Sequence, residues 1–321
     1  GAISQVVHLP VLTGRDDVEV AALSDADTPK AKTIAERFGV GEVLGARELL
    51  EKAELDAVVI STPNHLHQEQ ALAALESGRG VLVERPMAFN GRGVEEVIRT
   101  AADAGRVLLV GMTHRYRPDV ATLRSFVAGG ELGSVYAIRG AWLNRKVPLA
   151  RVTWRQRLEE AGGGVLMDLG VQALDLCLWL VGFPEVVRVT AVTRKGEHEV
   201  EDSASLMLIT EAGVALQVEV SSNYYGDGDR HYVRVMGSEG SGSLPPLQVQ
   251  KQLGGRPMDV TPEQPSEREN PYTSAYRRQL DHFVRAVAGE ADAPLPSEQV
   301  GLMDVVEAAY RSAGAEEEVT P

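Results

Sequence analysis

Two charged residues and a proline follow a short apolar run in the first third of the chain. The run is residues 81–83, and Glu84-Arg85-Pro86 come directly after it. An earlier apolar run, Val58–Ile60, ends at the turn-forming residues Ser61-Thr62-Pro63-Asn64. Such runs are typical of buried strands, and open α/β sheets bind ligands at the carboxyl ends of their strands. We therefore expect Glu84 and Arg85 to face a ligand, although the two could also form a local ion pair.

A second candidate site combines a carboxylate and an amide on one helix face. Asp168 and Gln172 follow the glycine run Gly162–Gly164, and residues four apart share a helix face. A carboxylate can take up a proton, whereas an amide only donates and accepts hydrogen bonds. Without the flanking glycines, Asp168 is equally well explained as a helix cap or as a core carboxylate with hydrogen-bond partners.

The elements around these residues predict two domains. The helical pattern from Gln68 to Gly78 joins the two apolar runs, so the strands should be parallel and share one ligand-binding edge. Val18–Leu23 and Val107–Gly111 are further expected strands, and Pro29–Phe38 and Val94–Ala104 are expected helices. Beyond residue 114 longer alternating strands predict a large, mostly antiparallel open sheet flanked by helices: Val135–Trp142, Val186–Thr193, Ala204–Thr210, Val214–Ser221 and His231–Val235. We expect domains at 1–114 and 115–321, with loops at Gly237–Pro246 and Arg256–Pro271.

Three motifs resemble the Gfo/Idh/MocA family of nicotinamide-dependent sugar and polyol oxidoreductases. Thr62-Pro63-Asn64-His65-Leu66-His67 resembles the family turn T-P-N-x-x-H, and Glu84-Arg85-Pro86 resembles E-K-P. The stretch from Gly162 to Asp175 resembles G-G-G-x-L-x-D-x-G-x-H-x-x-D. The resemblance implies an amino-terminal Rossmann domain that binds NAD(P) and a carboxyl-terminal domain for substrate binding and oligomerisation. Arg85 stands where the family has its catalytic lysine, and Gln172 stands where it has a histidine.

The start of the chain resembles the end of a dinucleotide-binding motif. Gly1, Ile3 and His8-Leu9-Pro10 match the family phrase G-x-G-x-I-x-x-x-x-H-L-P, so we expect the first strand and first glycine to lie upstream of Gly1. Asp25 follows the glycines by about 20 residues, the spacing of a carboxylate that binds the adenosine ribose. Residues 26–29 contain no arginine for a 2′-phosphate, which favours NAD over NADP. Alternatively, Asp25 caps the next helix, a position for which Asp27 is better spaced.

The resemblance also implies a set of site residues. The cofactor contacts are Gly1, Ile3, Asp25, Thr62, Pro63, Asn64, His67, Glu84 and Arg85. The residues expected at the reacting atoms are Arg85, Asp168 and Gln172, and those expected to bind substrate are Arg115, Trp154, Arg155, Asp168, Gln172 and Tyr272. His8 is expected to pack or to cap a helix. His65 and His67 lack a third ligand at a recognisable spacing, so we expect no metal.

The two motif differences bear directly on proton transfer. Arginine stays protonated up to a pH of about 12 and glutamine does not titrate, so neither replaces a lysine or histidine that exchanges protons. Loss of general acid–base help costs roughly 10²–10⁴ in rate. Asp168, His114 or an acidic group of the substrate could carry the proton instead, and Arg85, Arg145, Lys146 and Arg155 could bind a sugar acid. Two functions remain open: an oxidoreductase with an altered proton route, or a cofactor-binding sensor or regulatory protein with impaired catalysis.

Composition excludes several other classes of protein. The net charge of −14 argues against nucleic acid and anionic membranes as partners. Cys177 is the single cysteine, in an apolar helical run, which fits an inert core thiol in a reducing cytoplasm. The apolar stretch Gly164–Phe183 contains two aspartates and predicts a core helix rather than a membrane span. We expect a homodimer or homotetramer that covers the outer face of the large sheet, where Val218 and Val220 are candidates for exposure.

Overall fold

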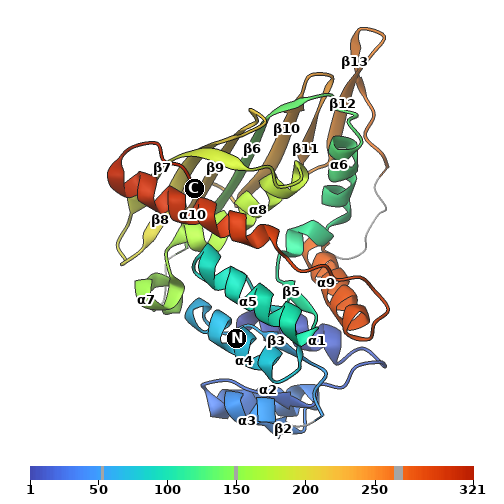
Figure 1. The fold of residues 1–321 in the computed structure, drawn as a ribbon, viewed down its shortest axis with the longest axis vertical. Coiled ribbons are helices and arrows are strands. Elements are labelled where there is room, and N and C mark those ends of the chain that lie inside the picture. Colours follow the sequence, from blue (N-terminus) through green and yellow to red (C-terminus); the bar gives the residue numbers. More distant parts are fainter. Residues whose placement is uncertain (52–53, 148–150, 264–269) are drawn as a thin grey trace. The chain divides into compact units, whose positions relative to one another are not determined.

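A computed structural model describes residues 1–51, 54–147, 151–263 and 270–321, which form two compact units (Figure 1). The first unit contains Gly1–Ala88, Arg92–Thr113 and the described residues from 270 to 297. The second contains Phe89–Gly91, the described residues from 114 to 263, and Glu298–Pro321. The segment 270–297 thus belongs to the first unit, although a single division after residue 114 would assign it to the second. The separate roles expected for 1–114 and 115–321 stay a prediction.

The first unit is built on short parallel strands. β3 (Ala57–Ile60), β4 (Gly80–Val83) and β5 (Leu108–Val110) form one sheet in which Val58 pairs with Val81. β1 (Ala22–Leu23) and β2 (Glu42–Val43) form a parallel pair. The helical segments are η1 (Ser4–His8), α1 (Leu9–Leu12), α2 (Thr28–Phe38), α3 (Ala46–Glu51), η2 (Asn64–Leu66), α4 (His67–Glu76) and α5 (Gly91–Ala104). The expected parallel β-α-β arrangement is confirmed, while β1 is much shorter than the expected strand 18–23.

A late helix completes the core of the first unit. α9 (Pro271–Val287) begins where the Asn270 side chain accepts a hydrogen bond from the Tyr272 amide. Its buried face packs Leu280 and Phe283 against Leu82 and Leu109 of the parallel sheet. Burial of each such side chain stabilises the fold by about 1.5–3 kcal/mol. The core of this unit therefore depends on residues almost two hundred positions apart.

The second unit contains an eight-stranded sheet in the order β13-β12-β11-β10-β6-β9-β8-β7. Every neighbouring pair is antiparallel except β6 and β9, so the expected large, mostly antiparallel sheet is confirmed. The strands are β6 (Val135–Arg145), β7 (Val186–Lys195), β8 (Glu201–Thr210), β9 (Ala215–Tyr224), β10 (Arg230–Gly237), β11 (Gly240–Leu244), β12 (Gln248–Leu253) and β13 (Arg256–Asp259). The helical segments are η3 (Thr113–Tyr116), α6 (Pro118–Ala128), η4 (Trp154–Gln156), α7 (Leu158–Ala161), η5 (Leu166–Gly170), α8 (Val171–Leu180) and α10 (Glu298–Ala315).

Two expectations about this sheet were wrong. The stretches 237–246 and 256–271 were expected to be loops, yet β11 and β13 lie within them. Val218 and Val220 were expected to supply the outer face, but both are buried, at 2% and 0% exposure. Residues two apart in a strand point to the same face, here the buried one. The outer face is lined instead by the alternating residues Gln217 and Glu219 and by residues in register with them on neighbouring strands, including the exposed Met207 and Val192.

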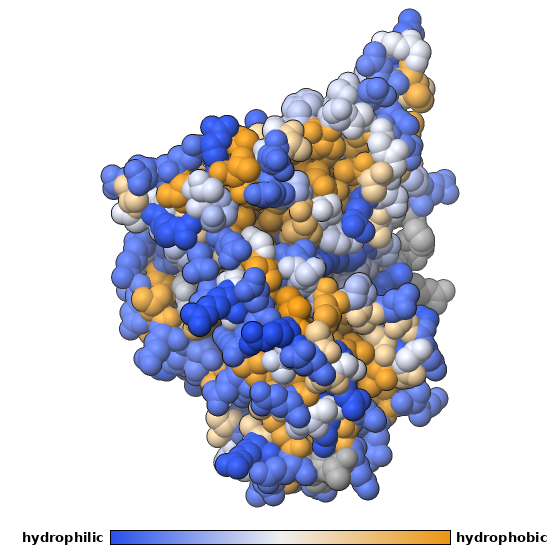
Figure 2. All heavy atoms as spheres, viewed as in Figure 1, coloured by the Kyte–Doolittle hydropathy of each residue, from blue (hydrophilic) through white to orange (hydrophobic). Residues whose placement is uncertain are grey.

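The longest apolar helical run lies inside the second unit. Among the described residues, Leu158–Leu180 is the one run long and apolar enough to cross a membrane, and 78% of its most apolar window is buried within the protein. Cys177 of this run is fully buried, and burial raises the pKa of its thiol to about 12. A core helix with an inert thiol, as the sequence predicted, accounts for both observations. Figure 2 shows hydrophilic residues over much of the molecular surface on the side viewed, with hydrophobic groups between them.

Candidate cofactor and substrate sites

The strand end at Glu84-Arg85-Pro86 is held by a buried histidine of the first helical segment. His8 Nε2 lies 2.9 Å from Glu84 Oε1, and the His8 ring is only 3% exposed. The carboxylate also lies tightly against Gly111, where an added Cβ would come within 2.7 Å of Glu84 Oε2. His8 therefore fixes a motif carboxylate, a more specific role than the packing or capping predicted from the sequence.

His67 holds the same strand end from its other side. Its Nδ1 lies 2.7 Å from the Pro86 carbonyl oxygen and its Nε2 lies 2.9 Å from that of Thr62. Burial lowers the pKa of this imidazole, outweighing the hydrogen bonds to Pro86 and Thr62, which act in the opposite direction. Both ring nitrogens thus lie against the protein's own carbonyls, and a neutral imidazole can donate to one of them. The geometry supports a brace between the turn and the strand end, and the cofactor contact expected from the motif stays a prediction.

The motif turn between these strands is itself well ordered by local contacts. Thr62 Oγ1 donates to Gln70 Oε1 of α4 at 2.8 Å, and Asn64, in the short helix η2 after Pro63, is 5% exposed. Arg85 is half-buried next to Glu84. These positions lie at the carboxyl ends of β3 and β4, as predicted, where parallel sheets bind ligands.

Tyr276 of α9 completes this polar cluster. Its ring meets that of His8 edge-on, with 6.0 Å between centroids. Burial, with a smaller contribution from the negative charge of Glu84, raises the pKa of the Tyr276 phenol to about 12. The phenol is therefore protonated at neutral pH, and its hydroxyl can both donate and accept a hydrogen bond. Tyr272, expected to bind substrate, lies one turn earlier and is 38% exposed.

Asp25 lies just beyond β1, close to the first residues of the chain. Its Oδ2 is 3.3 Å from the Gly1 nitrogen, and its Oδ1 accepts a hydrogen bond from the Asp27 amide. Asp27, not Asp25, caps α2, because its side chain accepts from the Lys30 amide at 3.1 Å. The prediction that Asp27 takes the capping role is thus confirmed. The pKa of Asp25 is lowered: burial acts to raise it, whereas the hydrogen bond from the Asp27 amide and the positive charge of Lys30 act to lower it.

The strand ends around Asp25 fit a dinucleotide. An added Cβ at Gly1 would come 3.4 Å from the Ser61 carbonyl oxygen, and Ser4 Oγ lies 2.6 Å from Ser61 Oγ. Ile3 immediately precedes this helical segment. In dinucleotide-binding folds, the pyrophosphate binds at a glycine turn and a helix amino terminus. The ribose binds to a carboxylate at the end of the next strand.

In the second unit, the carboxylate of Glu201 binds the start of the helical run that carries the third motif. Glu201 Oε2 accepts from the Gly164 amide at 2.9 Å and Oε1 accepts from the Leu166 amide at 3.0 Å. Tyr310 of α10 donates its hydroxyl to Glu201 Oε1 at 2.9 Å. Neither residue was predicted from the sequence. The glycine run indicated a close approach at this point, but it gave no sign of which segment approaches.

Asp168 lies in the π-helical turn η5, four residues after Gly164. Arg155 Nε is 3.6 Å from Asp168 Oδ2, and the Arg155 guanidinium lies over the Trp154 ring at 4.3 Å. The Gln172 side chain donates to the Asp168 carbonyl oxygen at 3.4 Å. The structure therefore brings together four residues of the predicted substrate set: Trp154, Arg155, Asp168 and Gln172. Single π-helical turns are frequent at functional sites.

Arg115 was expected to bind substrate, but its guanidinium is engaged inside the second unit. Nε and Nη2 bind the two oxygens of Asp175, with Nε 2.9 Å from Oδ2, and Nη1 lies 2.7 Å from Glu298 Oε1. Asp175 is 1% exposed and also accepts from Gln299. Arg115 thus neutralises a buried carboxylate, which argues for a structural role. His114, a candidate proton carrier, is 4% exposed and packs edge-on against Trp142 at 5.3 Å.

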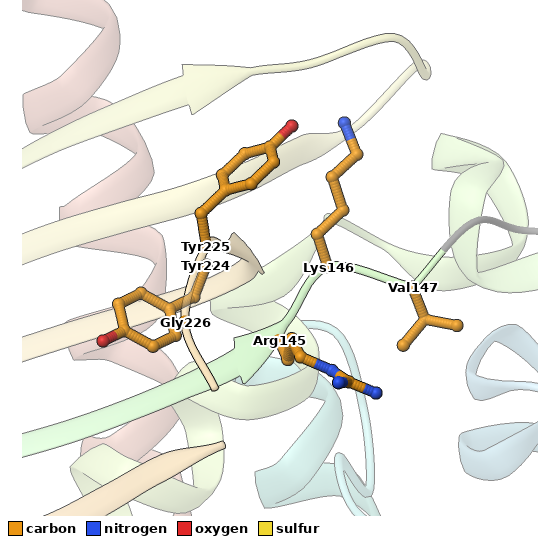
Figure 3. A pocket seen from close by; sticks show the side chains of 6 residues that line it. All are labelled: Arg145, Lys146, Val147, Tyr224, Tyr225 and Gly226. Carbon is orange, nitrogen blue, oxygen red and sulfur yellow. The ribbon is translucent and has the colours of Figure 1, made fainter. Parts of the chain in front are cut away.

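A shallow hollow of about 350 Å³ lies where β6 and β9 end. It is lined by Arg145, Lys146, Val147, Tyr224, Tyr225 and Gly226 (Figure 3). Lys146 Nζ lies 5.6 Å from the Tyr225 ring centroid and 3.9 Å from a Glu197 oxygen, whereas the Arg145 side chain extends in another direction. Since Arg155 is placed beside Asp168, the three cations suggested for an acidic substrate do not converge on one point within this unit.

Comparisons with known proteins agree with these two units. The family profile "Oxidoreductase family, NAD-binding Rossmann fold" matches residues 1–112, and the profile "GFO/IDH/MocA C-terminal domain" matches residues 120–243. D-glucoside 3-dehydrogenase of Escherichia coli is 34% identical over 60% of this chain and 54% of its own length, so this chain spans about half of that relative. Inositol 2-dehydrogenase 2 of Saccharopolyspora erythraea is 31% identical over 88% of this chain and 81% of its own length.

A solved structure extends the likeness to the whole fold. GenD2 from gentamicin A biosynthesis, in complex with NAD, superposes with a TM-score of 0.84 at 28% identity, covering 98% of this chain and 92% of that protein. The superposed fold and both family profiles therefore agree. This chain belongs to the Gfo/Idh/MocA family of oxidoreductases.

Proposed function

We propose that this protein transfers hydride between NAD and a secondary alcohol of a sugar, polyol or sugar-derived acid, with an altered proton-transfer site. One observation carries the cofactor half of the proposal. Asp25 is an ionised carboxylate at a strand end, next to Gly1. It does not cap the following helix, because Asp27 is the cap. A carboxylate in that position binds the ribose 2′-hydroxyl and repels a 2′-phosphate, so NAD is favoured over NADP.

The remaining cofactor contacts would come from the ends of β3 and β4. Thr62, Pro63 and Asn64 form one wall, and Glu84 and Arg85 form the next, braced by His8 and His67. Bound NAD supplies the hydride acceptor, which no side chain can provide. The residues of the protein bind and orient the cofactor. In this proposal His67 acts through Pro86 and Thr62, because its nitrogens lie against their carbonyl oxygens.

The proton route is the distinctive part of the proposal. When a secondary alcohol is oxidised, the hydride leaves carbon and the hydroxyl proton must go to a base. The third motif contains two carboxylates, of which Asp175 is bound to Arg115, and we propose that the carboxylate of Asp168 takes this proton. Arg85 and Gln172 would donate hydrogen bonds to substrate oxygens, because neither side chain exchanges protons near neutral pH.

The substrate class rests on the relatives. Two of them are named as dehydrogenases of glucosides and inositols, and both substrate classes carry secondary alcohols on a six-membered ring. Trp154, stacked on Arg155 beside Asp168, would offer the apolar ring face and the donor that a sugar needs. We therefore propose a pyranose or cyclitol as the substrate.

A second function follows from Arg85 and Gln172. Without the titrating lysine and histidine of the family motifs, the protein could bind cofactor and sugar without turnover and act as a sensor or regulatory subunit. The two functions differ in a single assay. Full-length protein is incubated with NAD and a panel of glucosides, inositols and sugar acids while the absorbance of reduced nicotinamide is followed.

Turnover by the wild type would exclude the sensor. Cofactor binding without turnover, together with activity gained in the variant carrying Arg85→Lys and Gln172→His, would exclude the enzyme proposal.

A further inference from the structure

We propose that Glu201 and Tyr310 are positioning residues that hold Asp168 for proton transfer, an inference that rests on the proposed function of Asp168. Glu201 is the first residue of β8, and its carboxylate accepts hydrogen bonds from the Gly164 and Leu166 amides at 2.9–3.0 Å. These amides begin the helical run that contains Asp168. Amides at a helix start lack partners within the helix, and a carboxylate there is favourable also because of the helix dipole.

Tyr310 keeps this carboxylate in place. Its hydroxyl donates to Glu201 Oε1 at 2.9 Å. Burial, followed by the negative charge of Glu201, raises the pKa of the Tyr310 phenol far above its ordinary value. The hydroxyl is consequently a donor at every pH at which the enzyme would be assayed. Glu201 Oε1 thus accepts from both a helix amide and a phenol.

The close approach of Glu201 and Tyr310 explains why the motif begins with consecutive glycines. A Cβ on Gly163 would come 2.0 Å from the Tyr310 hydroxyl oxygen, and a Cβ on Gly164 would come 2.0 Å from the Glu201 carbonyl oxygen. Both distances are far below any van der Waals contact. Because the second of these atoms belongs to the backbone, it cannot move aside as a flexible side chain can. The glycines therefore form the surface that receives Glu201 and Tyr310.

A short chain of contacts links this surface to the proposed base. The Asp168 amide donates to the Gly164 carbonyl oxygen at 3.0 Å, so the residue that Glu201 fixes is bonded directly to Asp168. Gln172 in turn donates to the Asp168 carbonyl oxygen. The π-helical turn contains one residue more than an α-helical turn. The direction of the Asp168 side chain therefore depends on where the turn begins, and Glu201 holds that beginning at Gly164. A displacement of about 1 Å at a catalytic group can cost roughly 10²-fold in rate.

The test uses Glu201→Gln and Tyr310→Phe in the full chain, with Glu219→Gln and Tyr232→Phe as matched controls. Glu219 is exposed on β9, and Tyr232 is 38% exposed on β10. We expect Glu201→Gln to lower kcat by about 10–100-fold per folded molecule, while the Kd for NAD stays within about twofold of wild type. Tyr310→Phe should have a smaller effect in the same direction. The controls should retain wild-type kcat.

A purely structural role would give a different pattern. It would lower the melting temperature while leaving kcat per folded molecule unchanged, and that result would overturn the proposal. Hydrogen exchange of residues 162–172 provides a readout that needs no turnover. Faster exchange in Glu201→Gln but not in Glu219→Gln would support the positioning contact, and equal exchange would contradict it. A wild type without turnover would count against the proposed function alone, since the exchange measurement would still report on Glu201.

Discussion

Arg85 and Gln172 decide how the protein could move a proton, because both occupy motif positions with side chains that do not titrate near neutral pH. Each can donate a hydrogen bond to a hydroxyl or carbonyl oxygen of the substrate. Asp168 alone among these motif residues can change its charge during turnover. In the proposed enzyme the three residues therefore have separate tasks: two bind substrate oxygens and one takes the proton.

Restoring the family residues should accelerate the reaction. We expect the variant with Arg85→Lys and Gln172→His to raise kcat by about 10²-fold or more, the lower end of what general acid–base groups contribute. Its rate should also acquire a dependence on pH near 6.5, the ordinary pKa of histidine. Steady-state rates from pH 5 to 9 measure both effects. An unchanged kcat, with NAD affinity intact, would show that protons already move efficiently through another group.

In the proposed enzyme, the choice between NAD and NADP depends on Asp25. Asp25→Ser removes an ionised acceptor for the ribose, and hydrogen bonds to charged groups are worth about 1.5–3 kcal/mol. We expect the Kd for NAD to rise by roughly 10–150-fold and the preference over NADP to shrink or reverse, with Lys30 close by to attract a phosphate. Asp27→Ala is the control. It should cost about 1 kcal/mol of stability through loss of the helix cap and leave the cofactor ratio unchanged.

At the residue level, the sequence predicted the role of a side chain correctly where that role depends on residues close by in the chain. Asp27 was correctly preferred over Asp25 as a cap because capping is decided within three residues. The engagement of Arg115 by Asp175 and Glu298 could not be foreseen, since those partners lie 60 and 183 positions away. The same holds for Glu201 and Tyr310, whose contacts with the glycine run depend on the packing of a strand and a distant helix.

At the level of elements, His67 ties the motif turn to the end of β4, and its titration should affect stability. Burial lowers the pKa of His67 in the folded state, so the unfolded chain binds a proton first as the pH falls below about 6.5. Stability from this group is therefore full above pH 6.5 and is lost as the pH falls toward the folded-state value. His231 is shifted in the same direction, also by burial.

The contribution of His67 can be separated by substitution. Melting temperatures measured from pH 7 to 5 should fall less steeply in His67→Gln than in wild type, although the variant should be less stable at pH 7. His231→Gln serves as the comparison for the other depressed histidine. A wild-type melting temperature that rises on acidification over this range would contradict the assigned direction.

The ion pair between Arg115 and Asp175 should be a major stabilising link among η3, α8 and α10. Removing one partner of a buried pair leaves the other charge uncompensated, at a cost of about 3–5 kcal/mol. Arg115→Ala should therefore lower the free energy of unfolding by that amount in denaturant titration. Arg157→Ala removes an exposed pair with Glu160 and should change it by less than about 1 kcal/mol. A stable Arg115→Ala protein that had lost only sugar binding would restore the substrate role expected from the sequence.

Sequence patterns located most long elements but missed the sheet edge. Strands β6 to β10 alternate buried and exposed residues, which is a clear signal of period two. β11 contains the sequence Gly-Ser-Gly-Ser-Leu, and β13 includes a proline with all four residues exposed. β13 is an edge strand, and β11 lies between β12 and β10. Such strands form because neighbouring strands offer hydrogen bonds, not because their own side chains favour it. The pairing of β11 and β13 could therefore not be predicted from the sequence.

At the scale of the whole molecule, the outer face of the large sheet is the expected site of self-association. Val192 of β7 and Met207 of β8 point to this face and are 68% and 46% exposed. Exposed valine and methionine on a broad sheet favour contact with a second copy. We propose a homodimer or homotetramer, with Val192→Glu and Met207→Glu together shifting it toward monomer. Sedimentation velocity measures this, and a monomeric wild type at micromolar concentration would contradict it.

A hydride-transfer assay is the most direct test of the proposed oxidoreductase activity and of Asp168 as its base. Full-length wild-type protein with NAD and a panel of glucosides, inositols and sugar acids should show an increase in the absorbance of reduced nicotinamide. The rate should fall by about 10²-fold or more when Asp168 is replaced by asparagine, while the Kd for NAD is unchanged. Turnover that survives Asp168→Asn at the wild-type rate would contradict the assignment of the base. A wild type that binds NAD and sugar yet never reduces the cofactor would contradict the enzyme itself.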